Sequence, residues 1–143
     1  MCVQQLTPTY TNAVPALHAA ALADDYAAFA RVGREAFETR EGDYESALLS
    51  YLWRCFEPLL SSPYRMQKAY AGALVTEMKD LAQLALTAPK DELFTMPPDI
   101  VFVNRLQFGF YSVLARLDVE ADYASVERQF IAEADEASAR KSA

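Results

Sequence analysis

The chain has 143 residues, of which 52% are hydrophobic and 23% charged, a balance that predicts one folded domain and excludes intrinsic disorder. Its 13 basic and 20 acidic residues leave a net charge of −7, which argues against a phosphate-neutralising, nucleic-acid-binding surface. Only 4 glycines beside abundant alanine favour packed helices over a β-sandwich or a glycine-rich phosphate loop.

Helix start and stop signals divide the first third of the chain into two expected helices. Thr7 followed by Pro8 is typical of a helix N-terminus, and this helix should extend to about Ala23, with a bend or restart near Pro15. Asp24 and Asp25 would cap a second helix, running from Tyr26 to about Phe37.

The middle of the chain predicts two more helices. Asp43 can cap a third, which continues to Phe56 before Pro58 ends or kinks it. The acidic residues Glu41, Asp43 and Glu45 are then favoured by the helix dipole. Ser61-Ser62-Pro63 predicts the start of a fourth helix, from Pro63 to about Leu86.

Two final helices follow a loop. Pro97-Pro98-Asp99 opens a fifth, to about Leu117, and Asp122 caps a sixth that holds Val126, Phe130 and Ile131 on one face. No strand pair is convincing. We therefore predict an all-α, bundle-like single domain over residues 1–143 with about six helices, of which the tail at 137–143 frays.

The cellular location is predicted from features that the sequence lacks. No basic, apolar signal peptide is visible at the start, and no stretch reaches the roughly 20 apolar residues of a membrane span. Cys2 and Cys55 do not form a disulfide framework. We expect a soluble, cytoplasmic chain.

Few residues suggest catalytic or metal chemistry. His18 is the only histidine, whereas a zinc site normally draws on three or four ligands, so we expect it to be packed or half-exposed. Cys55 lies on an apolar helix face, where a structural role is expected, and nothing marks Cys2 as reactive.

The most informative segment is the fifth expected helix, which is apolar almost all round and is therefore expected to be buried. Its Asn104-Arg105 pair then needs partners. Arg105 either pairs with an acidic residue or helix carbonyls, or contacts a ligand or a missing partner segment. Gly72 and Gly109 lie inside expected helices, where we interpret them as permitting close helix packing.

At this helix the sequence resembles the C-terminal end of the UbiB/AarF family of atypical kinase-like proteins. The similarity lies in Pro97-Pro98, Arg105, Gly109 and the apolar run after this glycine. The segment from Cys2 to Pro8 resembles the family segment directly after the metal-binding Asp-Phe-Gly or Asp-Tyr-Gly triplet. The acidic pair before Tyr26 is similar to the end of the next family helix.

The resemblance implies the helical C-lobe of an atypical kinase/ATPase linked to ubiquinone biosynthesis. The family's ATP-binding and Mg²⁺-binding residues lie upstream of the matching region, so no catalytic, cofactor or metal residue can be carried over, and ATP and Mg²⁺ are implied only for a full-length relative. Asn104, Arg105 and Gly109 carry over as scaffold or partner-contact positions, and Cys2 as the residue after the triplet.

The expected partner is the missing N-terminal kinase-like portion or another protein, with a homo-oligomer possible. A free-standing helical interaction module is the alternative, for which Tyr10, Tyr26, Phe29 and Phe37 are candidate contact residues. The amphipathic spacing of these four residues is equally well explained by a place in the core. An enzyme with a new site around Arg105 is a third hypothesis, although no base, nucleophile or metal set accompanies this residue.

Overall fold

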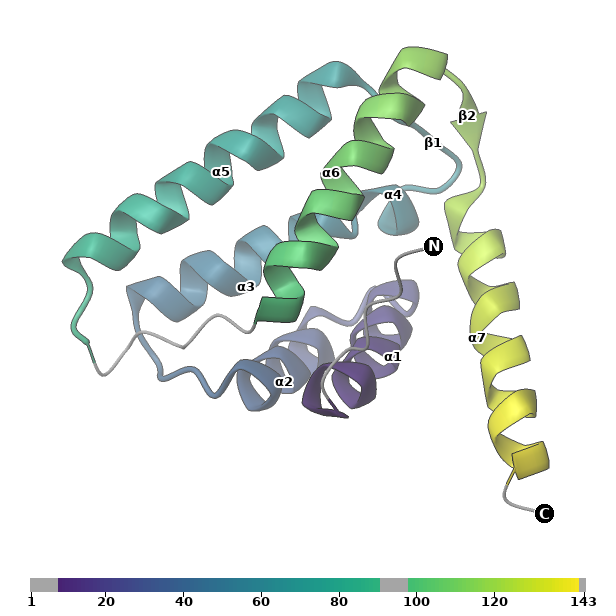
Figure 1. The fold of residues 1–143 in the computed structure, drawn as a ribbon, viewed down its shortest axis with the longest axis horizontal. Helices are drawn as coiled ribbons and strands as arrows, with labels where there is room; N and C mark the ends of the chain where they lie inside the picture. Colours follow the sequence, from purple (N-terminus) through teal and green to yellow (C-terminus); the bar gives the residue numbers. More distant parts are fainter. Residues whose placement is uncertain (1–7, 91–97, 142–143) are drawn as a thin grey trace.

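Seven helices and one two-stranded pair make up the described part of the chain, residues 8–90 and 98–141 of a computed structural model (Figure 1). The fold is all-α, as expected. In chain order the elements are α1 (Pro8–Leu22), α2 (Tyr26–Phe37), α3 (Asp43–Cys55), α4 (Glu57–Leu60), β1 (Tyr64–Arg65), α5 (Lys68–Thr87), α6 (Pro98–Leu117), β2 (Glu120–Ala121) and α7 (Tyr123–Lys141).

The first two helices form a hairpin where the sequence signals place it. The carboxylate of Asp25 accepts a 2.9 Å hydrogen bond from the Ala28 N–H, which satisfies one of the free amides at the start of α2. Glu38 ends α2 in the left-handed conformation at φ 50°, and its N–H bonds the Arg34 carbonyl.

The N-cap of helix α3 lies one residue earlier than expected. Gly42 is the N-cap and makes no side-chain cap bond, so Asp43 is the first helical residue rather than the cap. The expectation at Pro58 is confirmed, because α3 ends at Cys55 and a single turn, α4, restarts with this proline near its start.

The expected helix start at Pro63 is wrong. Residues 64–65 instead form β1, which pairs antiparallel with β2, and α5 begins only at Lys68. The Ser62 hydroxyl donates to the Asp122 carboxylate and accepts the Ala124 N–H, so it caps the distant α7 rather than its own segment. Tertiary contacts therefore hold this stretch extended, and they also create the strand pair that the sequence did not predict.

The core has two parts. Phe29, fully buried, centres the smaller cluster between α1 and α2, against Trp53 and Phe56 of the neighbouring elements. The larger cluster joins α3, α5 and α6, with buried Leu48, Tyr70 and Leu74. Phe29 and Phe37 are thus core residues, the second of the two interpretations that their spacing allowed.

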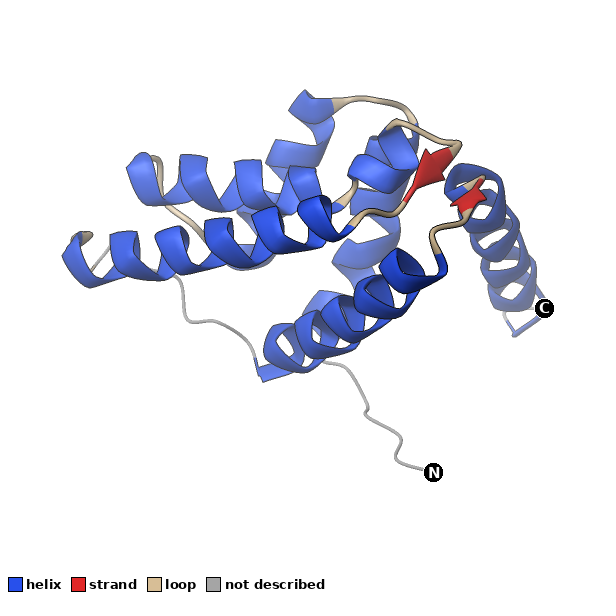
Figure 2. Ribbon diagram, turned by 90° about the horizontal axis from the view of Figure 1, so that it is seen from above, coloured by secondary structure: helices blue, strands red, loops and turns tan. Residues whose placement is uncertain are grey.

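The helices do not all pack equally. Helix α6 packs on α5, while α7 packs on α4 and stands at the edge of the molecule (Figures 1 and 2). Residues 137–141 belong to helix α7. The fraying expected for residues 137–143 stays a prediction. Within the described residues, no helix combines the length and apolar character that crossing a bilayer requires.

Candidate functional site

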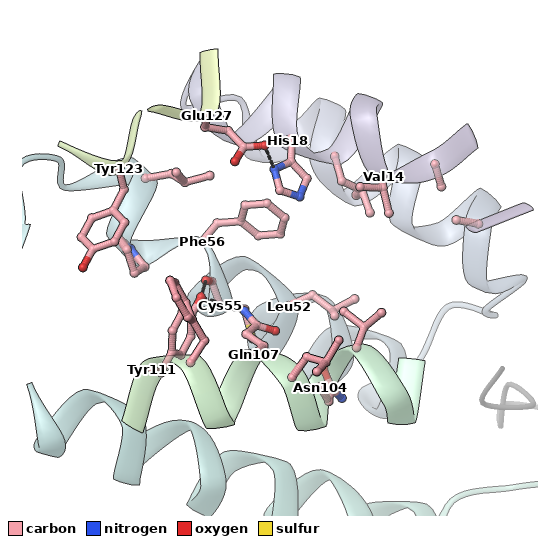
Figure 3. A pocket seen from close by; sticks show the side chains of 18 of the residues that line it. Val14, His18, Leu52, Cys55, Phe56, Asn104, Gln107, Tyr111, Tyr123 and Glu127 are labelled. Atoms are coloured by element: carbon pink, nitrogen blue, oxygen red, sulfur yellow. Dashed lines mark hydrogen bonds and ion pairs between the residues drawn. The ribbon is translucent and has the colours of Figure 1, made fainter. Parts of the chain in front are cut away.

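A cavity of about 640 Å³ lies between α6 on one side and α1, α4 and α7 on the other, with the end of α3 as its floor (Figure 3). That volume is within the roughly 300–1,000 Å³ of sites for small organic ligands. Its lining is largely apolar and comprises Ala13, Val14, Leu17, His18, Ala36, Phe37, Leu52, Cys55, Phe56, Pro58, Leu59, Val103, Asn104, Leu106, Gln107, Phe110, Tyr111, Tyr123 and Glu127.

One wall carries a pair of ionisable groups. His18 of α1 and Glu127 of α7 meet in a close ion-pair contact, and each side chain is about a quarter exposed (28% and 27%). The Nδ1 atom of His18 is itself buried, and the contact is not a hydrogen bond of standard geometry. The ring of His18 also packs edge-on against Phe56, with centroids 4.8 Å apart.

The opposite wall is a polar row on α6. Asn104, Gln107 and Tyr111 follow one another at spacings of three and four residues, which places them on one helix face. Gln107 Nε2 donates a 2.7 Å hydrogen bond to the Tyr111 hydroxyl. The Tyr111 hydroxyl donates in turn to the Cys55 carbonyl at 3.1 Å, which ties α6 to the end of α3.

Pro58 explains why one carbonyl in the last turn of α3 accepts from a tyrosine. It has no N–H to offer the carbonyl of Arg54, four residues earlier. The Tyr70 hydroxyl lies 2.9 Å from the Arg54 carbonyl and 3.3 Å from the Cys55 carbonyl, to which Tyr111 also donates. The floor of the cavity is therefore held by hydroxyl groups from α5 and α6.

The buried ionisable groups of the floor are neutral at physiological pH. Burial raises the pKa of the Cys55 thiol to about 12, so Cys55 is no thiolate nucleophile. Burial likewise raises the pKa of Tyr111 to about 12, despite its bond to Gln107. The expected structural role of Cys55 fits this buried, protonated state.

The described residues contain no group of three or more histidine, cysteine or carboxylate side chains placed to hold a metal ion. His18 and Glu127 bind each other, and the described lining offers no serine or reactive thiol beside them. The arrangement is suited to binding rather than to nucleophilic or metal-assisted chemistry.

The predicted site residues lie apart. Asn104 lines the cavity, whereas Arg105 is exposed and makes no ion pair with any described residue, so the expectation that it needs a buried partner is wrong. An alanine methyl at Gly109 or Gly72 would meet nothing within 4 Å, so neither glycine permits close packing. Cys2 lies outside the described residues.

Helix α6 is not buried all round, which corrects a central expectation. A stripe of five large apolar side chains is exposed along it, with Phe110 and Leu117 each 61% exposed. We call this the α6 stripe: Phe102, Leu106, Phe110, Val113 and Leu117. Leu106 and Phe110 also line the cavity, so the stripe borders its mouth. On α7, Val126 and Phe130 are exposed as well, instead of forming a buried face.

The cavity itself was missed at the level of sequence. Its residues come from six helices, and the His18–Glu127 pair joins positions more than 100 residues apart. The one available signal was Asn104 inside an otherwise apolar run, which did mark the polar row of α6.

No family model matches this chain, and neither the curated proteins nor the solved structures contain a match to it.

Proposed function

We propose that this chain is a non-catalytic helical support domain, equivalent to the C-lobe portion of a UbiB/AarF-like atypical kinase/ATPase. It docks through the α6 stripe onto the nucleotide-binding portion of such a protein. In that assembly ATP and Mg²⁺ would be held by the docked portion, whose chemistry the family links to isoprenoid quinone metabolism. The proposal rests on the sequence resemblance around Arg105 and Gly109.

The α6 stripe is the structural observation that carries the proposal. Monomeric proteins rarely expose a contiguous row of large apolar side chains unless it binds something. Helix α6 packs on α5 by one face and leaves the stripe uncovered by described residues. Arg105, exposed and ion-paired with no described residue, lies beside the stripe on the same helix, where a polar rim contact to a partner fits its position.

The test is a binding titration between the purified chain and the separately purified nucleotide-binding portion of a UbiB/AarF-family protein. We expect a saturable complex that the double variant Val113→Ser/Leu117→Ser weakens at least about 10-fold, as for central apolar contacts. Neither residue lines the cavity.

Leu86→Ser is the matched control, because Leu86 is an equally apolar side chain that is 79% exposed on α5, away from the stripe. It should leave the dissociation constant unchanged. Absence of binding, or equal loss in both variants, would contradict the proposal.

The α6 stripe also supports the alternative of a free-standing interaction module. In that case the chain would associate with itself or another protein without any kinase-like portion. Light scattering of the chain alone separates the two: a dimer that the Val113→Ser/Leu117→Ser variant dissolves favours the independent module, whereas a monomer favours the support domain.

A further inference from the structure

The cavity between α1, α3, α6 and α7 has the chemistry of a small-molecule site that neither docking proposal uses. Its apolar lining comes from aromatic and aliphatic side chains such as Phe56, Leu17 and Val103. The cavity is open to solvent at its mouth, where Leu106 and Phe110 are 59% and 61% exposed, and its volume of about 640 Å³ is enough for a small organic ligand. An apolar ligand would recover the contacts that these side chains lack.

The charged side chains of the cavity lining indicate which ligand charge the cavity favours. Among the described lining residues the histidine and the carboxylate are His18 and Glu127, and each is already occupied by its contact with the other. An anionic ligand would meet the Glu127 carboxylate without a free cation, and a cationic ligand would compete with His18. Burying an unpaired charge is costly, so the cavity favours an uncharged ligand.

The α6 wall supplies the hydrogen bonds. Asn104 is half-buried, and within the described residues its side-chain amide has no hydrogen-bond partner. Gln107 uses its Nε2 on Tyr111, which leaves its side-chain carbonyl able to accept. The labelled side chains of Asn104 and Gln107 lie on the α6 wall, across from His18 (Figure 3). A half-buried amide lining a void is a natural partner for a ligand hydroxyl or carbonyl.

We infer that this cavity binds an uncharged, mainly hydrocarbon small molecule that bears one hydroxyl or carbonyl group, which Asn104 and Gln107 orient. The apolar body lies against α1 and the end of α3. The site borders the docking surface, because Leu106 and Phe110 belong to both, but Val113 and Leu117 of the α6 stripe do not line the cavity.

The experiment uses the full chain and the neutral fluorescent probe N-phenyl-1-naphthylamine, displaced by three chains of equal length. These are 1-decanol, decanoate and decylamine, each below its micelle-forming concentration at pH 7. We expect 1-decanol to displace the probe at concentrations at least about 10-fold lower than either ion does, because only the ions bring an unpaired charge into the cavity.

Three variants locate the binding. Asn104→Leu keeps the volume and breaks no hydrogen bond to a described residue, so the fold should survive; we expect about 3- to 10-fold weaker 1-decanol binding, the worth of one hydrogen bond. Val113→Ser/Leu117→Ser should leave probe and decanol binding unchanged, whereas Val14→Phe, which fills the void, should reduce probe uptake with the helical circular dichroism retained.

Each contrary result overturns the inference. Absence of probe binding shows that the cavity takes no such ligand, and equal displacement by all three chains shows unspecific adsorption to apolar surface. Loss of binding in Val113→Ser/Leu117→Ser assigns the probe to the α6 stripe instead. A failed docking titration, by contrast, leaves this site untouched, because probe displacement is measured on the chain alone and is located by Asn104→Leu and Val14→Phe, which the docking experiment does not use.

Discussion

At the scale of single residues, the most consequential polar contact is one that the sequence pattern hides. Glu45 is 2% exposed, and its carboxylate accepts hydrogen bonds from Arg34 Nε at 2.7 Å, Arg34 Nη2 at 3.1 Å and the Thr39 hydroxyl at 2.7 Å. The bond from Arg34 is the main reason that the pKa of Glu45 is lowered. The Glu45 carboxylate therefore joins α2 to the first turn of α3. From the sequence alone, an acidic residue in that turn predicts only a favourable interaction with the helix dipole.

Arg34→Met should destabilise the chain more than Glu45→Gln does. Removing the arginine leaves a buried carboxylate without its cation, so we expect the larger loss in the free energy of unfolding for this variant, moderated because Arg34 is half-exposed. Glu45→Gln should cost about 1–2 kcal/mol. Urea unfolding of both variants and of the double variant measures this, and strictly additive losses would contradict the coupling.

Alanine substitutions at three glycines test which of them is needed for close helix packing. A Cβ atom added at Gly33 would lie 2.8 Å from Leu49 Cδ2 in the core. A Cβ atom added at Gly72 or Gly109 would have no neighbouring atom within 4 Å. Gly33→Ala should therefore lower the unfolding free energy by about 1 kcal/mol. Gly72→Ala and Gly109→Ala should raise it by about 0.5–1 kcal/mol, because alanine is the better helix former. Thermal unfolding of the three variants gives the comparison, and stabilisation by Gly33→Ala would disprove the close packing of α2 on α3.

At the scale of elements, α7 depends on its N-terminus because it packs on little besides α4. The Asp122 carboxylate accepts from the Ser125 hydroxyl at 2.7 Å, the Ser125 N–H at 3.0 Å and the Ser62 hydroxyl at 2.8 Å. These bonds, first those from Ser125, lower the pKa of Asp122 to about 2. The cap therefore fixes α7 to the segment before β1 as well as starting the helix.

Asp122→Asn should remove a pH-dependent part of the stability. Since the pKa of the folded state lies below the ordinary value, the carboxylate contributes fully above about pH 4 and loses its contribution as the pH falls through about 2. The variant keeps one oxygen for the Ser125 N–H and loses both the charge and the second oxygen, which accepts from the Ser125 hydroxyl. Unfolding free energies should thus differ from those of the native chain at pH 7 and converge between pH 4 and 2.

Asp80→Asn serves as the control for this titration, because Asp80 is exposed on α5 and makes no hydrogen bond or ion pair with a described residue. Its unfolding free energy should stay parallel to that of the native chain over the same pH range. A constant difference between Asp122→Asn and the native chain down to pH 2 would show that the charge of Asp122 does not stabilise α7.

At the scale of the whole molecule, the helices differ in how much of their apolar surface is buried. Helices α3 and α5 bury their apolar faces against each other, but α6 and α7 retain exposed apolar side chains. Between these helices and α1 lies a largely apolar cavity, with a row of polar side chains on its α6 wall. The exposed stripe and the cavity are the two features on which the binding proposals rest.

The amino-acid sequence by itself determined the all-α class and most helix boundaries, because caps such as Asp25 and Asp122 and breaks such as Pro58 act through bonds within a few residues. Only the tertiary structure decided that Ser62 serves a distant helix, that Glu45 is buried beside Arg34, and that α6 is open on one face. Those outcomes depend on which helices meet in space. An apolar run in a sequence predicts a helix whose apolar side chains favour burial. The packing of the neighbouring helices decides whether those side chains are buried within this chain or stay exposed for a partner.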